Sequence, residues 1–313
     1  MLPLPSSHIL QPTLLALGRL PARANLKPVP NRSALEGKSA QWQLSLDGTW
    51  RFQLVNGLDG APSDWTVSDT RNDPWRDILV PGVWTRQNTG DLPHYANWRM
   101  PFDCPNPPDV PSENPTGLYR MDVDLPLDWN NRRTVLHIGG FESLALVWCN
   151  GLFIGLGKDS RLPSEFDLTD AVQRGTNQIA IMVARWCDAT WIEDQDHWNH
   201  GGLHRSVFLE SRAETHISDL VVDTDYEPAT GAGQLQVQVK VAGPFSTHRA
   251  RFVLEDADGL ERHTSAAQPI DQFDTSRSVG AQWAQSYSFK NTAARFDVSL
   301  PKVAHWSDEV PTR

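Results

Sequence analysis

The chain has 313 residues, a formal net charge of −10 and 39% hydrophobic residues. This length favours two domains, because a domain has roughly 100 to 200 residues. The charge argues against a nucleic-acid partner, since phosphate binding needs clustered Lys and Arg and none occur here. No uninterrupted apolar segment is long enough to span a membrane.

The three cysteines, Cys104, Cys149 and Cys187, are an odd number without metal-type spacing. Neither a disulfide framework nor a zinc site is therefore expected, and we predict a cytoplasmic protein. The 13 tryptophans would suit a surface that stacks on sugars. Core packing is the more common role for any one of them, because indoles dominate the cores of proteins.

Residues 1–40 are predicted to form an irregular arm, because prolines at positions 3, 5, 12 and 21 interrupt any helix. Residues 41–54 alternate apolar and polar side chains around Asp47-Gly48, which predicts a β-hairpin. A long loop follows over residues 87–115, rich in Pro, Asn and Asp, and its aromatics (Tyr95, Trp98 and Phe102) suggest that it packs down onto the fold. A loop of this length inside a domain is usually functional or disordered.

Short strands are predicted next, over residues 117–125, 134–138, 144–148, 179–186 and 205–210, with an Asn150-Gly151 hairpin turn. Residues 164–172 are predicted to form the one helix. Short strands joined by turns favour an all-β fold, with a jelly-roll β-sandwich over residues 41–213.

The pattern of apolar and polar residues changes from residue 214 onward. Residues 234–241 and 249–254 alternate cleanly before an Asp258-Gly259 turn, and residues 294–300 form the last predicted strand. We therefore predict a smaller immunoglobulin-like β-sandwich over residues 214–313. About five strands are visible in the sequence where roughly seven are expected, so we expect this sandwich to be incomplete.

The segment 191–198 (WIEDQDHW) combines three carboxylates, a histidine and two indoles. Charges are rarely buried unless paired, so the segment is predicted to be a site on a loop that leaves strand 179–186. Glu193, Asp194 and Asp196 include candidates for the acid and the nucleophile of a glycosidase. The alternative is that they bind a cation or sugar hydroxyls, and the residues alone favour binding.

Two groups of histidines have different expected roles. His137 alternates with apolar neighbours and is predicted to be a core histidine with a hydrogen-bond partner. His197 and His200 lie in or beside the acidic segment and are candidates for ligand contact. Residues 155–160 (GLGKDS) fall short of a phosphate loop, because Leu152 stands where its first glycine is required.

Several motifs follow one another along the chain: 112–119 (SENPTGLY), 148–151 (WCNG), 157–168 (GKDSRLPSEFDL), 185–186 (RW) and 193–198 (EDQDHW). In their residues and their order these motifs resemble the N-terminal part of glycoside hydrolase family 2 β-galactosidases. The resemblance implies a galactose-binding-like jelly roll and an immunoglobulin-like domain, which the family continues into a TIM barrel. That barrel and its two catalytic glutamates are not in this sequence, so we expect no catalytic residue in this chain and predict it to be inactive alone.

The resemblance also implies roles for individual residues. In the family, the last Asp of the EDQD motif contacts galactose hydroxyls and a sodium ion, a role that falls on Asp196. An Asn in the preceding long loop contacts the sugar, which corresponds to Asn97. An Asp after the Arg-Trp pair helps a structural magnesium site, which corresponds to Asp188. Lys158 stands where that site usually has a neutral amide, and its ammonium would repel a divalent cation or replace it.

The sequence therefore predicts the N-terminal part of a retaining β-galactosidase that hydrolyses terminal β-D-galactosides such as lactose. Its expected partners are the substrate and the TIM-barrel part, in an enzyme that we expect to be a homo-oligomer, with sodium and magnesium as the implied ions. The alternatives are a free-standing galactose-binding or scaffold protein, and a fragment that complements a separate barrel chain.

Overall fold

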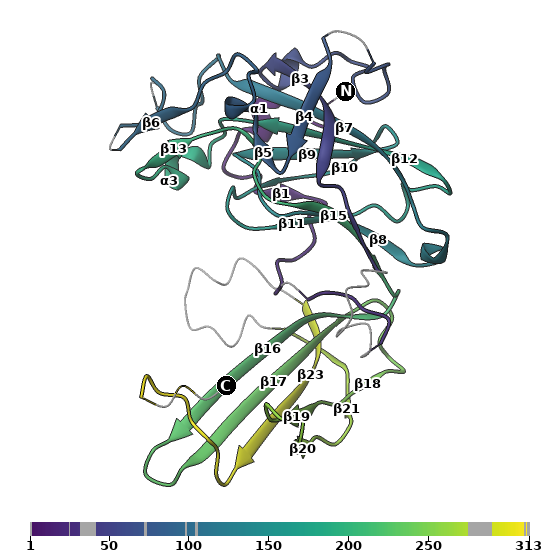
Figure 1. The fold of residues 1–313 in the computed structure, drawn as a ribbon, viewed down its shortest axis with the longest axis vertical. Helices are drawn as coiled ribbons and strands as arrows, with labels where there is room; N and C mark the ends of the chain where they lie inside the picture. The colour runs from purple at the N-terminus through teal and green to yellow at the C-terminus, as the bar shows by residue number, and fades with distance from the viewer. Residues whose placement is uncertain are drawn as a thin grey trace. The chain divides into compact units, whose positions relative to one another are not determined.

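The computed structural model describes residues 2–24, 26–31, 42–71, 74–97, 99–103, 106–274, 290–309 and 311. The chain forms two compact units, which Figure 1 shows as two groups of strands. Unit 1 comprises residues 1–22 and 28–212, and unit 2 comprises residues 23–27 and 213–313. Strands dominate both units, as the all-β prediction requires. Trp98 and Cys104, which the sequence analysis singled out, lie outside the described residues.

Unit 1 is a β-sandwich of two antiparallel sheets. In the part of the chain that the structure describes, the larger sheet has seven strands in the order β1-β10-β9-β12-β7-β3-β4, and the smaller has four in the order β11-β8-β15-β2. The larger sheet consists of β1 (Ala16–Leu17), β3 (Gly48–Asn56), β4 (Arg76–Val80), β7 (Pro115–Asp124), β9 (Leu144–Cys149), β10 (Leu152–Lys158) and β12 (Thr176–Ala184). The smaller sheet consists of β2 (Gln43–Ser45), β8 (Arg133–Ile138), β11 (Ser164–Asp167) and β15 (Val207–Arg212).

Several short elements complete unit 1. Two-stranded ribbons pair β6 (His94–Ala96) with β13 (His197–Asn199) and β5 (Gly82–Val83) with β14 (Gly202–Leu203). The short α-helices are α1 (Ser6–Ile9) and α3 (Thr190–Glu193). The 3-10 turns are η1 (Leu58–Gly60), η2 (Trp84–Arg86) and η3 (Leu127–Trp129).

Strand β12 is buried on both of its faces. Ile181 packs into the core between the two sheets, whereas its neighbour Met182 packs into a second core on the outer face of the larger sheet. Ile9 of α1 and Trp65 belong to that second core, so residues of the arm cover the sheet. A strand with both faces covered is expected to be continuously apolar, which explains the apolar run at 179–184.

The hairpin predicted for residues 41–54 is wrong. β2 pairs with β15 in the smaller sheet, and β3 pairs with β4 and β7 in the larger one, so Asp47-Gly48 crosses from one sheet to the other. The alternating apolar residues on either side face the same core from opposite sheets, which a one-dimensional pattern does not distinguish from a hairpin. The Asp47 carboxylate accepts a hydrogen bond from the backbone N–H of Val207 at 2.9 Å and holds the crossing in place.

The helix predicted for residues 164–172 is also wrong, because the segment begins as strand β11 and ends in turns. Ser164 to Asp167 pair with β8, and Glu165 ion-pairs with Arg212 at 2.7 Å. This pairing satisfies backbone and side-chain groups that an isolated turn of helix would leave to water, so the tertiary contact outweighs the local helix preference. The Asn150-Gly151 hairpin between β9 and β10 is confirmed, with both residues at positive φ (50° and 79°).

Unit 2 is a smaller all-β unit. Its main sheet has the order β16-β17-β23-β22, with short ribbons β18-β21 and β19-β20. Within the described residues it contains eight strands, more than the five or so predicted, because β16 and the short strands carry polar residues without clear alternation. The bounds are β16 (His216–Glu227), β17 (Ala232–Ala242), β18 (Arg249–Ala250), β19 (Val253–Glu255), β20 (Glu261–Thr264), β21 (Gln268–Pro269), β22 (Asp271–Asp274) and β23 (Lys290–Leu300).

Cys149 and Cys187 are free thiols in buried positions. Burial raises the pKa of Cys149 to about 11 and that of Cys187 to about 12. At pH 8 at most about one thiol in a thousand would then be ionised, and the thiolate is the reactive form. We predict that a Cys104→Ser variant shows no reaction with Ellman's reagent within minutes in the native state and a reaction of both thiols in guanidinium. Prompt labelling of the native variant would contradict this burial.

Among the helices that the structure describes, none has the length and apolar character needed to cross a membrane.

Candidate functional site

The predicted sugar-binding residues flank one end of the ribbon of β6 and β13. The ribbon pairs Ala96 with His197 in antiparallel register. Asn97 follows Ala96 and Asp196 precedes His197, so the two residues flank the last paired positions at this end of the ribbon. Both side chains are exposed, and Figure 1 shows the ribbon beside α3 at one end of unit 1. Two residues that are 99 positions apart thus lie at the same exposed end of the ribbon.

Tyr95 is the neighbour that fixes Asp196. Its phenol O–H donates a hydrogen bond to Oδ1 of Asp196 at 2.7 Å, and this bond raises the pKa of Tyr95. Asp196 keeps its second oxygen and the remaining lone pairs of the first for other donors. The carboxylate is therefore oriented by Tyr95 and can still accept hydrogen bonds from other donors.

Glu193 is an anchor for the acidic segment. Its two carboxylate oxygens accept hydrogen bonds from the backbone N–H of Ser160 at 3.2 Å and from the Ser160 hydroxyl. These contacts tie the end of α3 to the loop after β10. A carboxylate held in this way is poorly suited to act as a nucleophile, because its charge is already shared with two donors.

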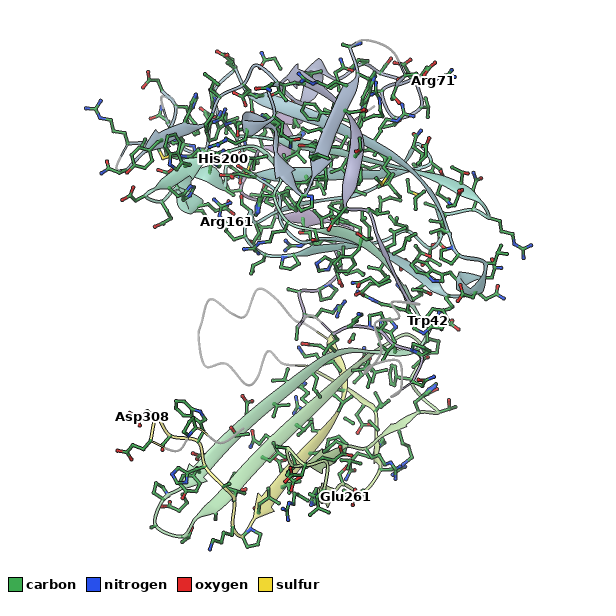
Figure 2. All side chains as sticks on the ribbon, in the orientation of Figure 1. Trp42, Arg71, Arg161, His200, Glu261 and Asp308 are labelled. Atoms are coloured by element: carbon green, nitrogen blue, oxygen red, sulfur yellow. The ribbon has the colours of Figure 1, made fainter. Side chains whose placement is uncertain are left out.

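His197 and Arg161 support the ribbon from its other face. The Arg161 guanidinium contacts Glu142 at 3.4 Å and donates to Nε2 of His197 at 3.3 Å. Nδ1 of His197 lies 3.0 Å from the carbonyl of Trp198, so a neutral His197 protonated on Nδ1 satisfies both contacts. His200 contacts the Thr85 hydroxyl at 2.8 Å, and burial lowers its pKa. Figure 2 shows Arg161 and His200 in the same part of unit 1.

His137 is a core histidine, as predicted. Its Nδ1 lies 3.1 Å from Glu165, and its ring stacks on Phe208 with centroids 4.2 Å apart. Among the aromatics of the long loop, Phe102 is packed down, because its ring makes edge contacts with Trp186 and Trp191, whereas Tyr95 is 53% exposed.

A buried arginine that was not among the predicted site residues supports the ribbon. Arg185 is fully buried and ion-pairs with Asp91 at 2.6 Å. It also donates to the carbonyl of Asn199 in β13 at 2.9 Å, while Asp91 accepts from the indole N–H of Trp84 at 2.7 Å. Arg185 therefore joins the ribbon to the loop after β5. The Arg-Trp motif was the feature of the sequence that could have indicated this role.

Asn114 joins the same structure from the Glu-Asn-Pro-Thr-Gly motif. Its side-chain amide donates to the carbonyl of Trp186 and accepts from the backbone N–H of Trp186, both at 2.9 Å. These two hydrogen bonds take the place of one pair of backbone hydrogen bonds between strands, next to Arg185. The Glu-Asn-Pro-Thr-Gly and Arg-Trp motifs are far apart in the sequence. They come together here because both support the same ribbon.

The chain is similar to known proteins over most of its length. Residues 44–213 match the family described as "Glycosyl hydrolases family 2, sugar binding domain". This chain belongs to glycoside hydrolase family 2. The β-galactosidase of Psychromonas ingrahamii is 34% identical over 280 residues, 90% of this chain and 26% of that protein. The β-galactosidase of Enterobacter cloacae is 37% identical over 305 residues, 96% of this chain and 28% of that protein.

The chain therefore spans about a quarter of the length of these relatives. Two solved structures share the fold at lower identity. A β-glucuronidase of Bifidobacterium dentium has a TM-score of 0.62 and 17% identity, over 87% of this chain and 44% of that one. A β-glycosidase of Bacteroides vulgatus has a TM-score of 0.57 and 18% identity, over 86% of this chain and 30% of that one.

This family member does not fit the magnesium site that the resemblance implies. The ammonium of Lys158 lies 2.5 Å from Oδ1 of Asp188 and 2.9 Å from the backbone carbonyl of Gln11. Lys158 and Asp188 are 3% and 4% exposed. A divalent cation needs several oxygen ligands, including carboxylates, and here a positive charge already occupies the side of Asp188 that such an ion would use. Asp188 is therefore an ion-pair partner of Lys158 and a poor magnesium ligand.

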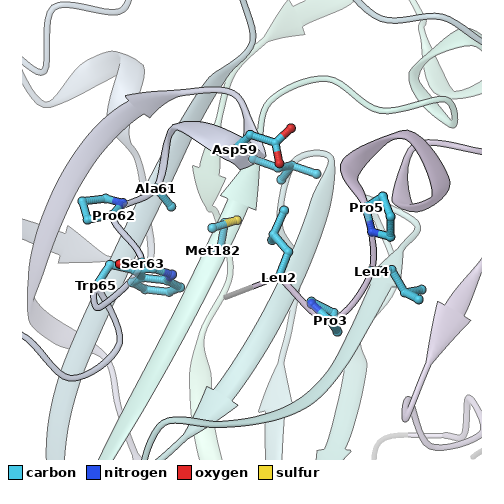
Figure 3. Close-up of a pocket in the computed structure, with 11 residues that line it drawn as sticks. Leu2, Pro3, Leu4, Pro5, Asp59, Ala61, Pro62, Ser63, Trp65 and Met182 are labelled. Carbon is cyan, nitrogen blue, oxygen red and sulfur yellow. The ribbon is translucent and has the colours of Figure 1, made fainter.

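A pocket of about 390 Å³ lies away from the ribbon, between the arm and the outer face of the larger sheet. Figure 3 shows Met182 of β12 between Leu2 of the arm and the segment with Trp65. Asp59 is the carboxylate in its lining, and it accepts a hydrogen bond from the Ser6 hydroxyl at 2.5 Å. The lining residues include no second carboxylate that could act together with Asp59 in catalysis. We therefore assign the pocket to the packing of the arm against the sheet.

Proposed function

We propose that this chain works as the N-terminal part of a β-galactosidase that hydrolyses terminal β-D-galactosides, such as lactose, with retention of configuration. The observation that carries the proposal is that Asn97 and Asp196 flank the same end of an exposed ribbon in a family 2 sugar-binding domain. The names of the similar proteins support the same activity.

The proposed work of the chain is to position the galactosyl unit. Asp196 accepts hydrogen bonds from sugar hydroxyls, and bonds to a charged acceptor are about twice as strong as neutral ones. Asn97 adds an amide that both donates and accepts. Holding the glycosidic bond in place accelerates its cleavage by catalytic groups elsewhere. Those groups, two glutamates, come from the TIM-barrel part of the enzyme, so the chain alone is inactive.

The side-chain oxygens of Asp196 also suit a sodium ion, which takes oxygen ligands. Sodium bound there would add positive charge beside the sugar hydroxyls, with its other ligands supplied by the rest of the enzyme. The full-length enzyme is proposed to be a cytoplasmic homo-oligomer, and the free thiols of Cys149 and Cys187 suit a reducing compartment.

The test is an Asp196→Asn substitution in the enzyme that carries this chain. Loss of the charged acceptor is expected to lower kcat/KM for lactose by about 10- to 100-fold, since hydrogen bonds to charged groups contribute about 1.5–3 kcal/mol. The sodium dependence of KM should weaken as well. Asp122→Asn, at an exposed carboxylate in β7, is the control and should leave both unchanged.

An Asp196→Asn enzyme with normal kcat, KM and sodium response would refute the assignment of this residue. Hydrolysis of lactose by the purified chain alone would refute the proposal that its catalytic groups lie elsewhere. Activity that appears only when the chain is mixed with a separate barrel fragment would mean that the two parts complement one another.

A further inference from the structure

Glu142 carries a buried carboxylate that the proposed galactosyl site does not use. Its side chain is 9% exposed, although a charged group is rarely buried unless it is paired. The carboxylate lies 3.4 Å from the guanidinium of Arg161, whose side chain is 42% exposed. Burial costs the carboxylate much of its hydration, so its contacts must offset that cost.

The contacts of Glu142 lead to both ends of β13. The Arg161 guanidinium, which pairs with Glu142, also donates to Nε2 of His197, the first residue of β13, at 3.3 Å. Beyond the other end of β13, the backbone N–H of Glu142 donates to the carbonyl of Gly202 at 3.1 Å, and the two residues form an antiparallel bridge. One residue therefore holds the strand that directly follows Asp196 from both sides.

The negative charge of Glu142 is what joins these parts. Burial raises the pKa of the Glu142 carboxyl, and the Arg161 guanidinium limits this rise. The ring of His197 and the backbone N–H of His200 limit it further. Because unlike charges attract more strongly where water is excluded, the carboxylate draws the loop with Arg161 and the residues of the ribbon toward one point.

Arg161 depends on this charge for its position. A guanidinium that is 42% exposed can bind water instead, and ordering a long side chain costs conformational entropy. Without the carboxylate, we expect the guanidinium to turn into solvent and to lose its contact with His197. Strand β13 can then shift, and Asp196 shifts with it because it is the adjacent residue.

We propose that Glu142 is a positioning residue that holds Asp196 in place for the galactosyl hydroxyls, acting through Arg161 and β13. This inference rests on the proposed function, because it takes Asp196 to be the sugar ligand. Glu142 raises the fraction of molecules whose ribbon is in the binding position, and the apparent affinity of a ligand falls with that fraction. A bound substrate selects the correct position, so the rate of the bound complex is kept.

The test is Glu142→Gln in the enzyme that carries this chain, a change that keeps the size of the side chain and removes its charge. KM for lactose should rise by about 3- to 10-fold, less than for a direct ligand because Glu142 acts through other residues. The sodium concentration that gives half of the full activation should rise by a similar factor, since both ligands need the same ribbon position. The value of kcat should stay within about twofold. A merely structural role would instead lower kcat through loss of folded enzyme and leave KM unchanged.

Arg161→Gln tests the same link from its other end, at a side chain exposed enough for the change to be tolerated even if Glu142→Gln folds poorly. It should raise KM by about the same factor as Glu142→Gln. The double variant should be no worse than either single variant, because both changes break one connection. If the two factors multiply, Glu142 and Arg161 act independently and the proposed connection is wrong.

Glu165→Gln is the matched control. Glu165 is also a buried carboxylate with an arginine partner, Arg212 at 2.7 Å, but it lies in β11 of the smaller sheet. Its loss should leave KM and the sodium response unchanged, whatever its effect on stability.

Asp196→Asn separates failure of this inference from failure of the proposed function. If Asp196→Asn weakens lactose hydrolysis and Glu142→Gln changes neither KM nor the sodium response, only the positioning role of Glu142 is wrong. If Asp196→Asn itself has no effect, the proposed function fails first, and the inference fails with it.

Discussion

Replacing Arg185 by methionine should lower the free energy of unfolding of the chain by about 3–5 kcal/mol, the usual cost of removing one partner of a buried ion pair. The side chain is fully buried, and its loss leaves Asp91 without its guanidinium partner at 2.6 Å. The carbonyl of Asn199 loses its donor at the same time. Urea denaturation followed by circular dichroism measures the change.

The substitution should also weaken the site, because Asn199 belongs to the strand that follows Asp196. A displaced ribbon misplaces the sugar, and a misplacement of about 1 Å costs up to about 100-fold in rate. At a temperature where the variant is folded, kcat/KM for lactose should therefore fall by about 10-fold or more. Unchanged stability would show that Arg185 does not hold the loop and the ribbon together.

Arg71→Met is the matched control for the buried arginine. Arg71 also pairs with an aspartate, Asp69, at 2.7 Å, but the Arg71 side chain is 87% exposed. Water and salt screen such a pair, so its loss should not shift the urea midpoint measurably. A large shift in this control would mean that burial does not decide the strength of these pairs.

Much of the fold could be predicted from the sequence, because strands with two covered faces leave a strong pattern. The apolar run ending at Ala184 predicts β12, and Asn150-Gly151 predicts the hairpin between β9 and β10. Pairing partners are harder to predict. Asp47-Gly48 has the composition of a hairpin turn, yet β2 and β3 belong to different sheets. Local propensity does not encode which distant strand completes a sheet.

The candidate site was partly predictable for a similar reason. A cluster of carboxylates at 193–196 stands out as a site in any soluble sequence, because unpaired charges avoid the core. Its position at the same end of the ribbon as Asn97 depends on the register between segments about 100 residues apart, which composition alone does not show. The support from Arg185 depends on an ion pair with Asp91 and has no local pattern. Both need the three-dimensional fold.

Replacing Lys158 by methionine should be among the most destabilising single changes in the chain, at about 3–5 kcal/mol. It leaves the Asp188 carboxylate, which is 4% exposed, without its ammonium partner at 2.5 Å. It also removes the donor to the carbonyl of Gln11, a contact that holds the arm to the end of β10. The arm of the variant should therefore be cut faster by trypsin than that of the unmodified chain.

A double variant separates the lost ion pair from lost packing. Lys158→Met combined with Asp188→Leu removes both charges, and replacing a buried ion pair by apolar residues is often neutral or stabilising. The double variant should recover most of the stability lost in Lys158→Met. Lys240→Met, at an ion pair with Asp219 whose lysine side chain is 30% exposed, is the control and should have a smaller effect than Lys158→Met.

Metal removal tests the same pair in the unmodified chain. Because the ammonium of Lys158 already neutralises Asp188, EDTA should leave the melting temperature and the tryptic cleavage of the arm unchanged, and added magnesium should not raise the melting temperature. A ligand that binds only the folded state would raise the melting temperature with its concentration, so magnesium-dependent melting would show that a divalent cation binds here despite the lysine. With EDTA-resistant melting and a destabilised Lys158→Met variant together, the charge at Asp188 is supplied by the chain itself, and the arm is held without a metal ion.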